Sequence, residues 1–306
     1  MQNSLIMSSQ TRLTRAYEQA KRISFDNTSK FILFSDCHRG DGSFADDFAN
    51  NRNIYFHALQ QYYKNAFQYI ELGDGDELWE NMFFKDILDA NKNVFLLLKK
   101  FYQKDKLHMI YGNHDMVYRN PDIVKKYFAE YFDTNADKNM PLMPHLKFDE
   151  AIVLKHAATG QELFFTHGHQ ADFMNYVGWK INRFFVRVLW KPLQVWGIKD
   201  PTSPAKNYTE RIKVERRIKK WIVTNGNRIT VVGHMHRPCF PKPNDNAINF
   251  FNDGSCVHPR NITGIEIEKG KIALAKWLVD TNEDGVLQIV KEYIETPKDL
   301  EGYTNK

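Results

Sequence analysis

The hydrophobic pattern of the chain alternates between short apolar runs and longer amphipathic stretches. The runs "KFILF", "FQYIEL", "KLHMIY", "ELFFT" and "RITVV" are rich in aliphatic and aromatic residues and predict buried strands. Residues 51–66 and 82–104 carry apolar residues at helical spacing and predict helices. Strands separated by helices are typical of right-handed βαβ units. The local pattern therefore predicts a largely parallel sheet.

The two ends of the chain have different patterns. "INFF" predicts one further strand, and residues 262–279 alternate across Lys269-Gly270, which predicts an antiparallel hairpin. Residues 1–22 lack the apolar core of a signal peptide and predict a short exposed helix. No apolar run approaches the roughly 20 residues that a membrane-spanning helix needs. We therefore expect neither a secretory signal nor a membrane span.

Polar residues follow the predicted strands in a recurring way. Five apolar runs end in Asp, His or Asn beside Gly: "FSDCHRG", "LGDGDE", "YGNHD", "FTHGH" and "VVGHMH". Asp36, Asp74 and Asn113 are 38 and 39 residues apart, an interval that suits a repeated strand–helix–strand unit. In open α/β sheets the carboxyl ends of the strands line the crevice where ligands bind. We therefore expect the five loops to converge in space.

The side chains in these loops are typical metal ligands. In a short extended segment positions i and i+2 point the same way, so Asp36 with His38, and His234 with His236, can each present two ligands. The candidate ligands are Asp36, His38, Asp74, Asn113, His167, His234 and His236. This mixture of carboxylate, imidazole and amide oxygen suits Mn²⁺ best, with Fe or Zn²⁺ as alternatives. Seven ligands exceed the needs of one ion and predict two ions about 4 Å apart with a bridging carboxylate.

A single Asp-x-His or His-x-His pair in a chain with 11 histidines is weak evidence of a metal site. "GNHD" alone could equally form a turn, since Asn and Asp favour turns. The prediction depends on the joint occurrence of five such loops, each after an apolar run.

As a set, these loops resemble the five motifs of the calcineurin-like metallophosphoesterases: D-x-H, G-D-x-x-D/E, G-N-H-D/E, H-G and G-H-x-H. "NDGS" at residues 252–255 also resembles the N-x-G-S segment of that family, and the resemblance runs from about Phe31 to Ile267. It implies an α/β fold, a calcineurin-like β-sandwich of mixed sheets flanked by helices, with a dimetal site at the strand ends. That expectation replaces the single parallel sheet.

The resemblance also implies roles for individual residues. One metal ion is assigned to Asp36, His38 and His236, and the other to Asn113, His167 and His234, with Asp74 bridging. His114 is expected to act on the leaving-group side, with Asp115 holding its imidazole. The implied reaction is hydrolysis of a phosphoester by water that the metal ions activate.

A basic segment separates the fourth and fifth loops. Residues 173–220 contain 12 basic and 3 acidic residues, a local net charge of +9 in a chain whose net charge is +5. Lys180, Arg183, Arg187 and Lys191 recur at helical spacing, and Pro192, Pro201 and Pro204 divide the segment into two helical pieces. We expect one metallophosphoesterase domain over 1–306 with a helical insertion over 170–225. The insertion is either a packed helix pair with a solvated basic face, or a lid or interface for an anionic lipid or polyanionic substrate.

The insertion resembles the lid of the UDP-2,3-diacylglucosamine hydrolases, which cleave a nucleotide pyrophosphate bond on a lipid. Trp79 and Asp172 fit that branch as well, whereas His114 stands where those enzymes usually have Arg. The candidate phosphate-binding residues are Arg39, Arg260, Arg183 and Arg187, because guanidinium groups match phosphoryl oxygens.

Three functions remain in view. The first is a dimetal phosphodiesterase or pyrophosphatase acting on a nucleotide-lipid or similar diester. The second is a phosphomonoesterase, including a protein serine/threonine phosphatase. The third is a non-catalytic module of the same fold that binds metal or nucleic acid. The complete ligand set and His114 favour an enzyme, and no nucleic acid is expected as a partner. Three cysteines favour a reducing compartment, so we expect a cytoplasmic protein, with peripheral contact at the inner membrane surface as an alternative.

Overall fold

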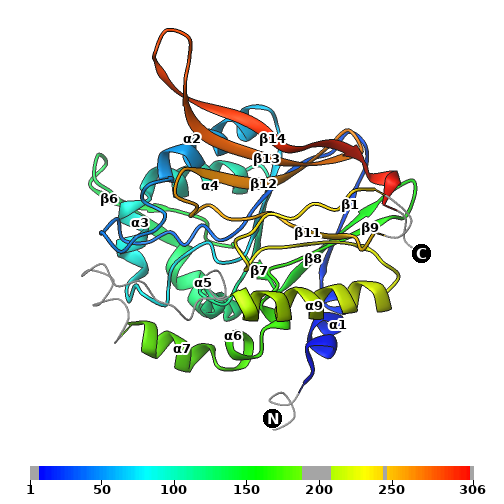
Figure 1. Cartoon of the computed structure of the whole chain (residues 1–306). Helices are drawn as coiled ribbons and strands as arrows, with labels where there is room; N and C mark the ends of the chain where they lie inside the picture. The colour runs from blue at the N-terminus through cyan, green and yellow to red at the C-terminus, as the bar shows by residue number, and fades with distance from the viewer. Residues whose placement is uncertain (1–6, 188–207, 244–246, 304–306) are drawn as a thin grey trace.

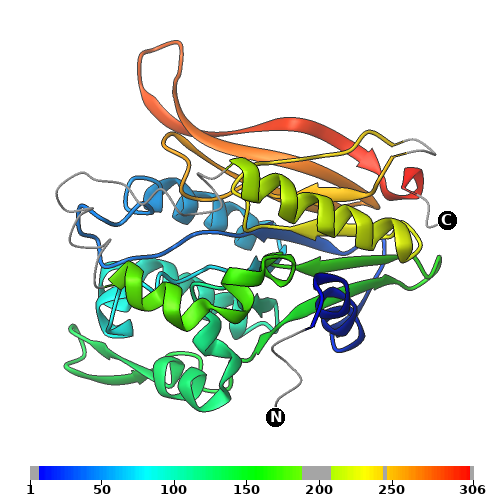
Figure 2. The same ribbon diagram turned by 60° about the horizontal axis from the view of Figure 1, so that its bottom comes forward.

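A computed structural model of the chain describes residues 7–187, 208–243 and 247–303. Two β-sheets pack face to face, and helices cover the outer face of each sheet (Figures 1 and 2). The predicted mixed α/β fold is therefore confirmed. The single parallel sheet that the local pattern predicts is wrong, because the strands divide between two sheets.

The larger sheet has seven strands, in the order β14-β13-β12-β2-β3-β4-β7. Their bounds are β14 Leu287–Asp299, β13 Lys271–Thr281, β12 Asn261–Glu268, β2 Lys30–Phe34, β3 Gln68–Leu72, β4 Leu107–Ile110 and β7 Phe148–Asp149. Strands β2, β3, β4 and β7 are parallel, whereas β12, β13 and β14 pair antiparallel. The β12–β13 hairpin turns at Lys269-Gly270 as predicted, and both residues have positive φ.

The smaller sheet has five strands, in the order β1-β8-β9-β10-β11. Their bounds are β1 Lys21–Phe25, β8 Ala151–His156, β9 Glu162–Thr166, β10 Ile229–Val232 and β11 Phe250–Asn252. Strand β8 is antiparallel to β9, and the other neighbours are parallel. A separate antiparallel pair consists of β5 Glu130–Asp133 and β6 Lys138–Pro141.

The helices form two outer layers. Those against the seven-stranded sheet are α2 Arg52–Lys64, α3 Phe84–Ala90, α4 Lys92–Tyr102 and α5 Pro121–Phe128. Those against the five-stranded sheet are α1 Ser9–Glu18 and α9 Tyr208–Thr224. Two short helices, α6 Phe173–Val177 and α7 Trp179–Phe185, and the 3₁₀ turns Met116–Arg119, His169–Ala171 and Leu300–Gly302 complete the described elements.

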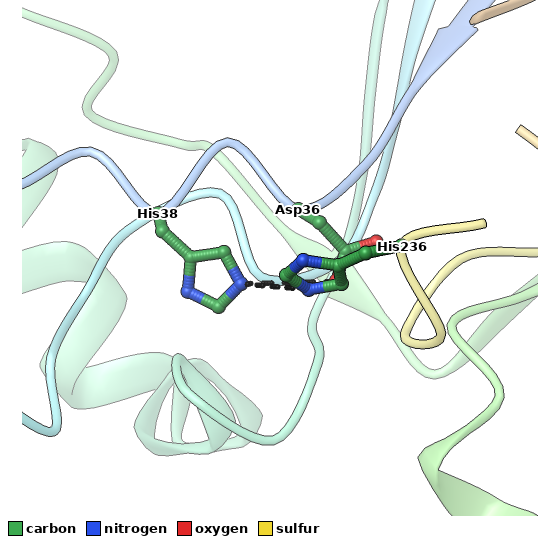
Figure 3. A group of neighbouring side chains, drawn as sticks. All are labelled: Asp36, His38 and His236. Carbon is green, nitrogen blue, oxygen red and sulfur yellow. Dashed lines mark hydrogen bonds and ion pairs between the residues drawn. The ribbon is translucent and has the colours of Figure 1, made fainter. Parts of the chain in front are cut away.

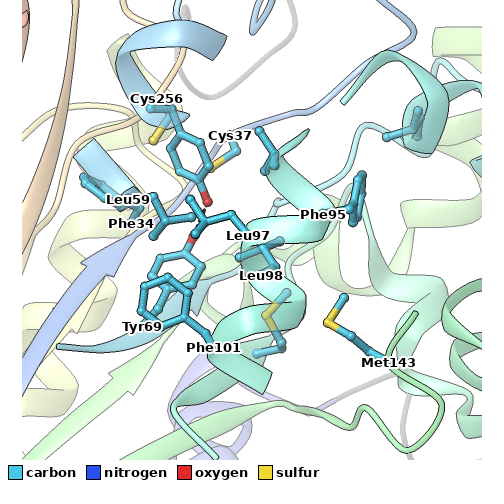
Figure 4. Close-up of a cluster of buried hydrophobic side chains, with 14 of the residues drawn as sticks. Phe34, Cys37, Leu59, Tyr69, Phe95, Leu97, Leu98, Phe101, Met143 and Cys256 are labelled. Carbon is cyan, nitrogen blue, oxygen red and sulfur yellow. Dashed lines mark hydrogen bonds between the residues drawn. The ribbon is translucent and has the colours of Figure 1, made fainter. Parts of the chain in front are cut away.

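The central strands of the two sheets are largely apolar because both of their faces are buried. In β2, Phe31 and Leu33 belong to the core between the sheets, and Ile32 and Phe34 belong to the core beneath the helices. Figure 4 shows the second of these cores, where Phe34 and Tyr69 meet side chains of α4. The five polar loops follow the apolar runs at the carboxyl ends of β2, β3, β4, β9 and β10, and so gather at one end of the sheets.

The N-terminal helix is not exposed, in contrast to the prediction from the sequence. Leu13 and Ala16 of α1 are fully buried, and Trp221 of α9 donates a hydrogen bond from its indole nitrogen to Thr14 (2.9 Å). No helix in the described ranges is both long and apolar enough to cross a bilayer.

The described parts of the insertion occupy two places. Helix α9 buries Val214, Ile218 and Trp221 against the five-stranded sheet, so it belongs to the outer helical layer. Helices α6 and α7 directly follow the loop that contains His167 and therefore border the polar end of the sheets. Lys191 and the three prolines of the predicted break lie outside the described residues.

Candidate metal centre

The five loops converge, and backbone hydrogen bonds join four of them in two pairs. The amides of Asp36 and His38 donate to the carbonyl oxygens of Gly73 (3.0 Å) and Asp74 (2.9 Å). The Gly233 amide donates to the carbonyl oxygen of His167 (3.0 Å). The loops after β2 and β3 therefore continue the pairing of those two strands, and the loops after β9 and β10 do the same.

The candidate ligands have an unusual backbone. Ten described non-glycine residues have positive φ, and five of them are Asp36, His38, Asp74, His234 and His236. The left-handed region costs such residues about 1–3 kcal/mol each and is retained mainly at functional sites. The concentration of this strain at predicted ligands supports a functional centre here.

Glycine occurs beside the ligands because side chains approach the backbone too closely for a Cβ atom. A Cβ on Gly112 would lie 2.1 Å from Oδ1 of Asp74. A Cβ on Gly233 would lie 2.6 Å from Oδ2 of Asp36. The Gly in these two loops therefore makes room for a ligand carboxylate.

One ligand group consists of Asp36, His38 and His236 (Figure 3). The two imidazoles approach each other at 3.3 Å between their Nε2 atoms. Oδ1 of Asp36 lies 2.9 Å from Nε2 of His236 and 3.7 Å from Nε2 of His38. The three donor atoms therefore surround one point at the end of β2.

A second ligand group consists of Asp74, His167 and His234, and it is buried. Nδ1 of His167 lies 2.9 Å from the carbonyl oxygen of Leu72, so it donates a hydrogen bond and leaves the lone pair of Nε2 for a metal. That Nε2 atom is 3.1 Å from Oδ2 of Asp74. Asp172, which precedes α6, approaches Nε2 of His234 at 3.4 Å.

The donor atoms fit a pair of divalent cations. Oδ2 of Asp74 is 3.1 Å from His167 and 3.8 Å from His38, so this carboxylate lies between the two groups, as a bridging ligand requires. Three buried donor atoms make no hydrogen bond in the described structure: Oδ1 of Asp36, Oδ1 of Asn113 and Nε2 of His167. Leaving such groups unpaired is costly, and metal coordination would satisfy all three.

Opposite charges dominate the electrostatics of the second group. Burial by itself would lower the pKa of His167, but the carboxylates of Asp74 and Asp36 raise it to about 9. Burial would raise the pKa of Asp172, but its hydrogen bond to His234 and the charge of that imidazole lower it to about 2. Because a metal must displace the protons of its ligands, metal uptake at this centre releases protons.

Glu77 connects His114 to the first ligand group, and the sequence analysis assigned it no role. Its carboxylate lies 2.7 Å from Nδ1 of His38 and 2.8 Å from Nδ1 of His114. Trp79 stacks on the His114 ring with 4.1 Å between centroids. The signal for Glu77 was its place at the end of "LGDGDE", which matches the last position of the second motif.

The prediction that Asp115 holds the imidazole of His114 is wrong, because Glu77 makes that contact. The Asp115 carboxylate accepts hydrogen bonds from the backbone amides of Gly112 (2.6 Å) and Gly75 (2.8 Å). Its position at the turn makes these amides its nearest donors. Asp115 therefore ties the third loop to the second.

The prediction that Arg39 contacts phosphate is also wrong. Its guanidinium is fully buried and binds both oxygens of Glu71 at 2.6 and 2.7 Å and Oδ1 of Asp76 at 2.7 Å. Glu71 lies inside β3, where an unpaired carboxylate would be very costly, so Arg39 neutralises it.

The other three candidate arginines make different contacts. Arg187 donates hydrogen bonds to the carbonyl oxygens of Leu78 (2.9 Å) and Asn81 (3.2 Å), which ties the insertion to the loop of Glu77. Arg183 lies over the ring of Trp179. Arg260 is exposed just before β12. No described contact joins these three guanidinium groups to the ligands, and the side chain of Lys180 lies outside the described structure.

A mixed two-sheet sandwich with a polar, ligand-rich centre at the strand ends defines the class of this protein. The chain belongs to the calcineurin-like phosphoesterase family, whose model matches residues 29–238. No curated protein sequence matches it. One similar solved structure is Vps29 of Chaetomium thermophilum, with 11% identity, a TM-score of 0.37 and coverage of 92% of this chain and 100% of that one.

Proposed function

We propose that this protein is a dimetal-dependent phosphoester hydrolase that acts on diester or pyrophosphate bonds. The observation that carries the proposal is the pair of adjacent ligand groups, Asp36–His38–His236 and Asp74–His167–His234, whose donor atoms within each group lie within 4.8 Å of one another. Asn113 contributes a further unpaired oxygen. When bound, two ions would supply Lewis-acid activation of water and neutralise phosphoryl charge. Mn²⁺ suits these donors, with Fe or Zn²⁺ as alternatives.

His114 is the residue proposed to act on the leaving group. Its backbone amide donates to Oδ1 of Asp74 (2.8 Å), which fixes it beside the ligands. Its Nδ1 atom faces Glu77 and its ring stacks on Trp79, so Nε2 is the nitrogen left to hold a proton for a leaving oxygen. This arrangement favours catalysis over a role in binding alone.

A substrate with an apolar part, such as a nucleotide-lipid, is the finer proposal. Large apolar side chains are exposed in three segments that adjoin the ligand loops: Phe44, Met82, Phe83, Phe173, Met174 and Phe184. Exposed large apolar side chains near a polar centre are typical of ligand or membrane contact. The resemblance of the insertion to the lid of UDP-2,3-diacylglucosamine hydrolases points in the same direction.

Contact with an anionic membrane is supported by the outer side of α9. Ile212, Arg216, Lys220 and Val223 line a hollow of about 530 Å³ along this helix. Arg216 and Lys220 are exposed and lie one turn apart beside the apolar residues. A basic and apolar helix face suits the surface of an anionic bilayer.

The activity is tested with a panel of phosphomonoesters, phosphodiesters and nucleotide pyrophosphates, assayed with Mn²⁺ and after chelation. We expect Mn²⁺-dependent hydrolysis that is faster for diesters or pyrophosphates than for monoesters. Exposed His145 provides a matched control, because His145→Ala removes an imidazole away from the centre and should leave activity unchanged. Faster monoester hydrolysis would favour the phosphomonoesterase alternative. Metal-loaded protein without any hydrolysis would favour the binding module.

The membrane contact is tested by sedimentation with vesicles that contain anionic lipid. Each basic residue near such a surface contributes about 1 kcal/mol, so Arg216→Gln/Lys220→Gln should weaken binding by roughly 30-fold. Lys64→Gln/Lys155→Gln removes the same charge from exposed sites elsewhere and should have little effect. Equal binding by wild type and both double variants would contradict the role of α9.

A further inference from the structure

A serine hydroxyl lies between two buried carboxyl groups behind the first ligand group. Oγ of Ser35 is 2.7 Å from Oδ1 of Asp253 and also makes a short hydrogen bond with Oδ2 of Asp36. All three side chains are inaccessible to solvent or nearly so. Ser35 follows β2 and Asp253 follows β11, so this contact joins the two sheets at the metal centre.

The number of protons in this arrangement is constrained. A hydroxyl has one proton and can donate it to one carboxylate only. The second carboxyl oxygen at hydrogen-bond distance must therefore carry a proton of its own and donate it to Oγ of Ser35. One of the two aspartates that flank Ser35 is therefore a neutral acid.

The surroundings identify which aspartate is neutral. Asp36 is surrounded by donors, since its Oδ2 accepts the backbone N–H of His234 (2.9 Å) and its Oδ1 lies 2.9 Å from Nε2 of His236. Asp253 has no such support: its Oδ2 is buried and has no described partner. Burial and the nearby charge of Asp36 raise the pKa of Asp253 well above its usual range. An anion at Asp253 would leave its Oδ2 atom buried without a hydrogen-bond donor.

We propose that Asp253 is a neutral carboxylic acid that donates to Ser35, which in turn donates to Asp36, and that this chain of hydrogen bonds positions Asp36 as a metal ligand. The inference rests on the proposed dimetal function. With Oδ2 of Asp36 held by Ser35 and by the amide of His234, its Oδ1 is directed toward His38 and His236. Asp253 is a positioning residue and touches neither substrate nor metal.

The Mn²⁺ affinity of variants at Asp253 distinguishes a neutral hydrogen-bond donor from an anion at that position. Asp253→Asn keeps a neutral N–H donor of the same shape, whereas Asp253→Ala and Ser35→Ala interrupt the chain of hydrogen bonds. Mn²⁺ binding to the metal-stripped, full-length protein is measured by calorimetry. We expect Asp253→Asn to bind within about twofold of wild type. Asp253→Ala and Ser35→Ala should lose about 10–100-fold in affinity for one ion, the usual effect of removing a group that orients a ligand.

Infrared spectroscopy tests the protonation state directly and does not depend on activity. The difference spectrum between wild type and Asp253→Asn at neutral pH should show the loss of a protonated-carboxyl band. Absence of that band, or an Asp253→Asn variant that binds Mn²⁺ as weakly as Asp253→Ala, would overturn the role of Asp253 alone. Wild-type protein that binds no Mn²⁺ would overturn the proposed function together with it.

Discussion

The two ligand groups of the candidate metal centre differ in their exposure. In the inner group the side chains of His167 and Asp74 are 0% and 2% exposed, whereas in the outer group those of His38 and His236 are 11% and 20% exposed. The inner group is oriented by the Leu72 carbonyl and by Asp172, both within the fold. The outer group faces His114, whose side chain is 21% exposed.

Under the proposed function, this difference in exposure suits the two ligand groups to different tasks. Ligands that are buried and held by the backbone suit an ion that stays bound, since their removal leaves unpaired groups in the core. The partly exposed imidazoles of His38 and His236, beside that of His114, suit the side where a phosphoryl group and its leaving oxygen would enter. Under the proposed function, metal retention and catalysis would be divided between these two ligand groups of one centre.

The largest loss of metal and of turnover is expected at Asp74, the ligand that the two groups share. Asp74→Ala should reduce occupancy of both metal sites, because its carboxylate lies between the two groups. Metal ions contribute several kcal/mol to such reactions, so turnover should fall by more than about 10³-fold. Elemental analysis after Mn²⁺ loading, with His145→Ala as the control, measures the occupancy. Undiminished metal content in Asp74→Ala would contradict the bridging position.

His114→Ala should lower turnover without reducing the metal occupancy of either ligand group. We expect full metal occupancy and a fall in turnover of about 10²–10⁴-fold, the usual contribution of a general acid. The loss should be smaller for nitrophenyl esters, whose leaving group needs no proton. Comparing esters of nitrophenol with esters of an aliphatic alcohol gives the answer, and equal losses for both would argue against this role.

Glu77→Gln should produce an intermediate effect confined to the outer half. The amide keeps the shape of the side chain but weakens its contacts with His38 and His114. A loss of about 10–100-fold in affinity for the outer ion is expected. Calorimetric titration with Mn²⁺ should show one weakened and one unchanged site. Equal weakening of the inner site would contradict the prediction that Glu77 affects only the outer ion.

The smallest effect concerns thermal stability. Metal at 100 times its dissociation constant stabilises the folded state by about 2.7 kcal/mol. Removing it with a chelator should therefore lower Tm by about 5 °C. Calorimetric scans of wild type and Asp74→Ala, each with Mn²⁺ and with chelator, provide the comparison. A chelator effect of the same size in Asp74→Ala would show that the stabilising metal binds elsewhere.

The elements with strong local signals could be predicted from the sequence. Strands β2, β3 and β4, helices α2 and α4 and the hairpin at Lys269-Gly270 follow directly from hydrophobic spacing and turn residues. The convergence of the polar loops could also be expected, because parallel strands end at a common edge. Strands β1, β8 and β14 were not predicted; β1 pairs with β8, which is distant in sequence, and β14 is a largely exposed edge strand.

The residue types at the strand ends, and with them the donor chemistry of the centre, follow from the amino-acid sequence alone. The partner of each charged side chain depends instead on how the chain folds. Arg39 lies beside a predicted ligand but binds Glu71, because a buried carboxylate in β3 needs a counter-charge. Asp115 lies beside His114 but binds backbone amides, and Glu77 takes its place. Burial and distance in space set the free energy of each pairing, and neither can be read from positions along the chain.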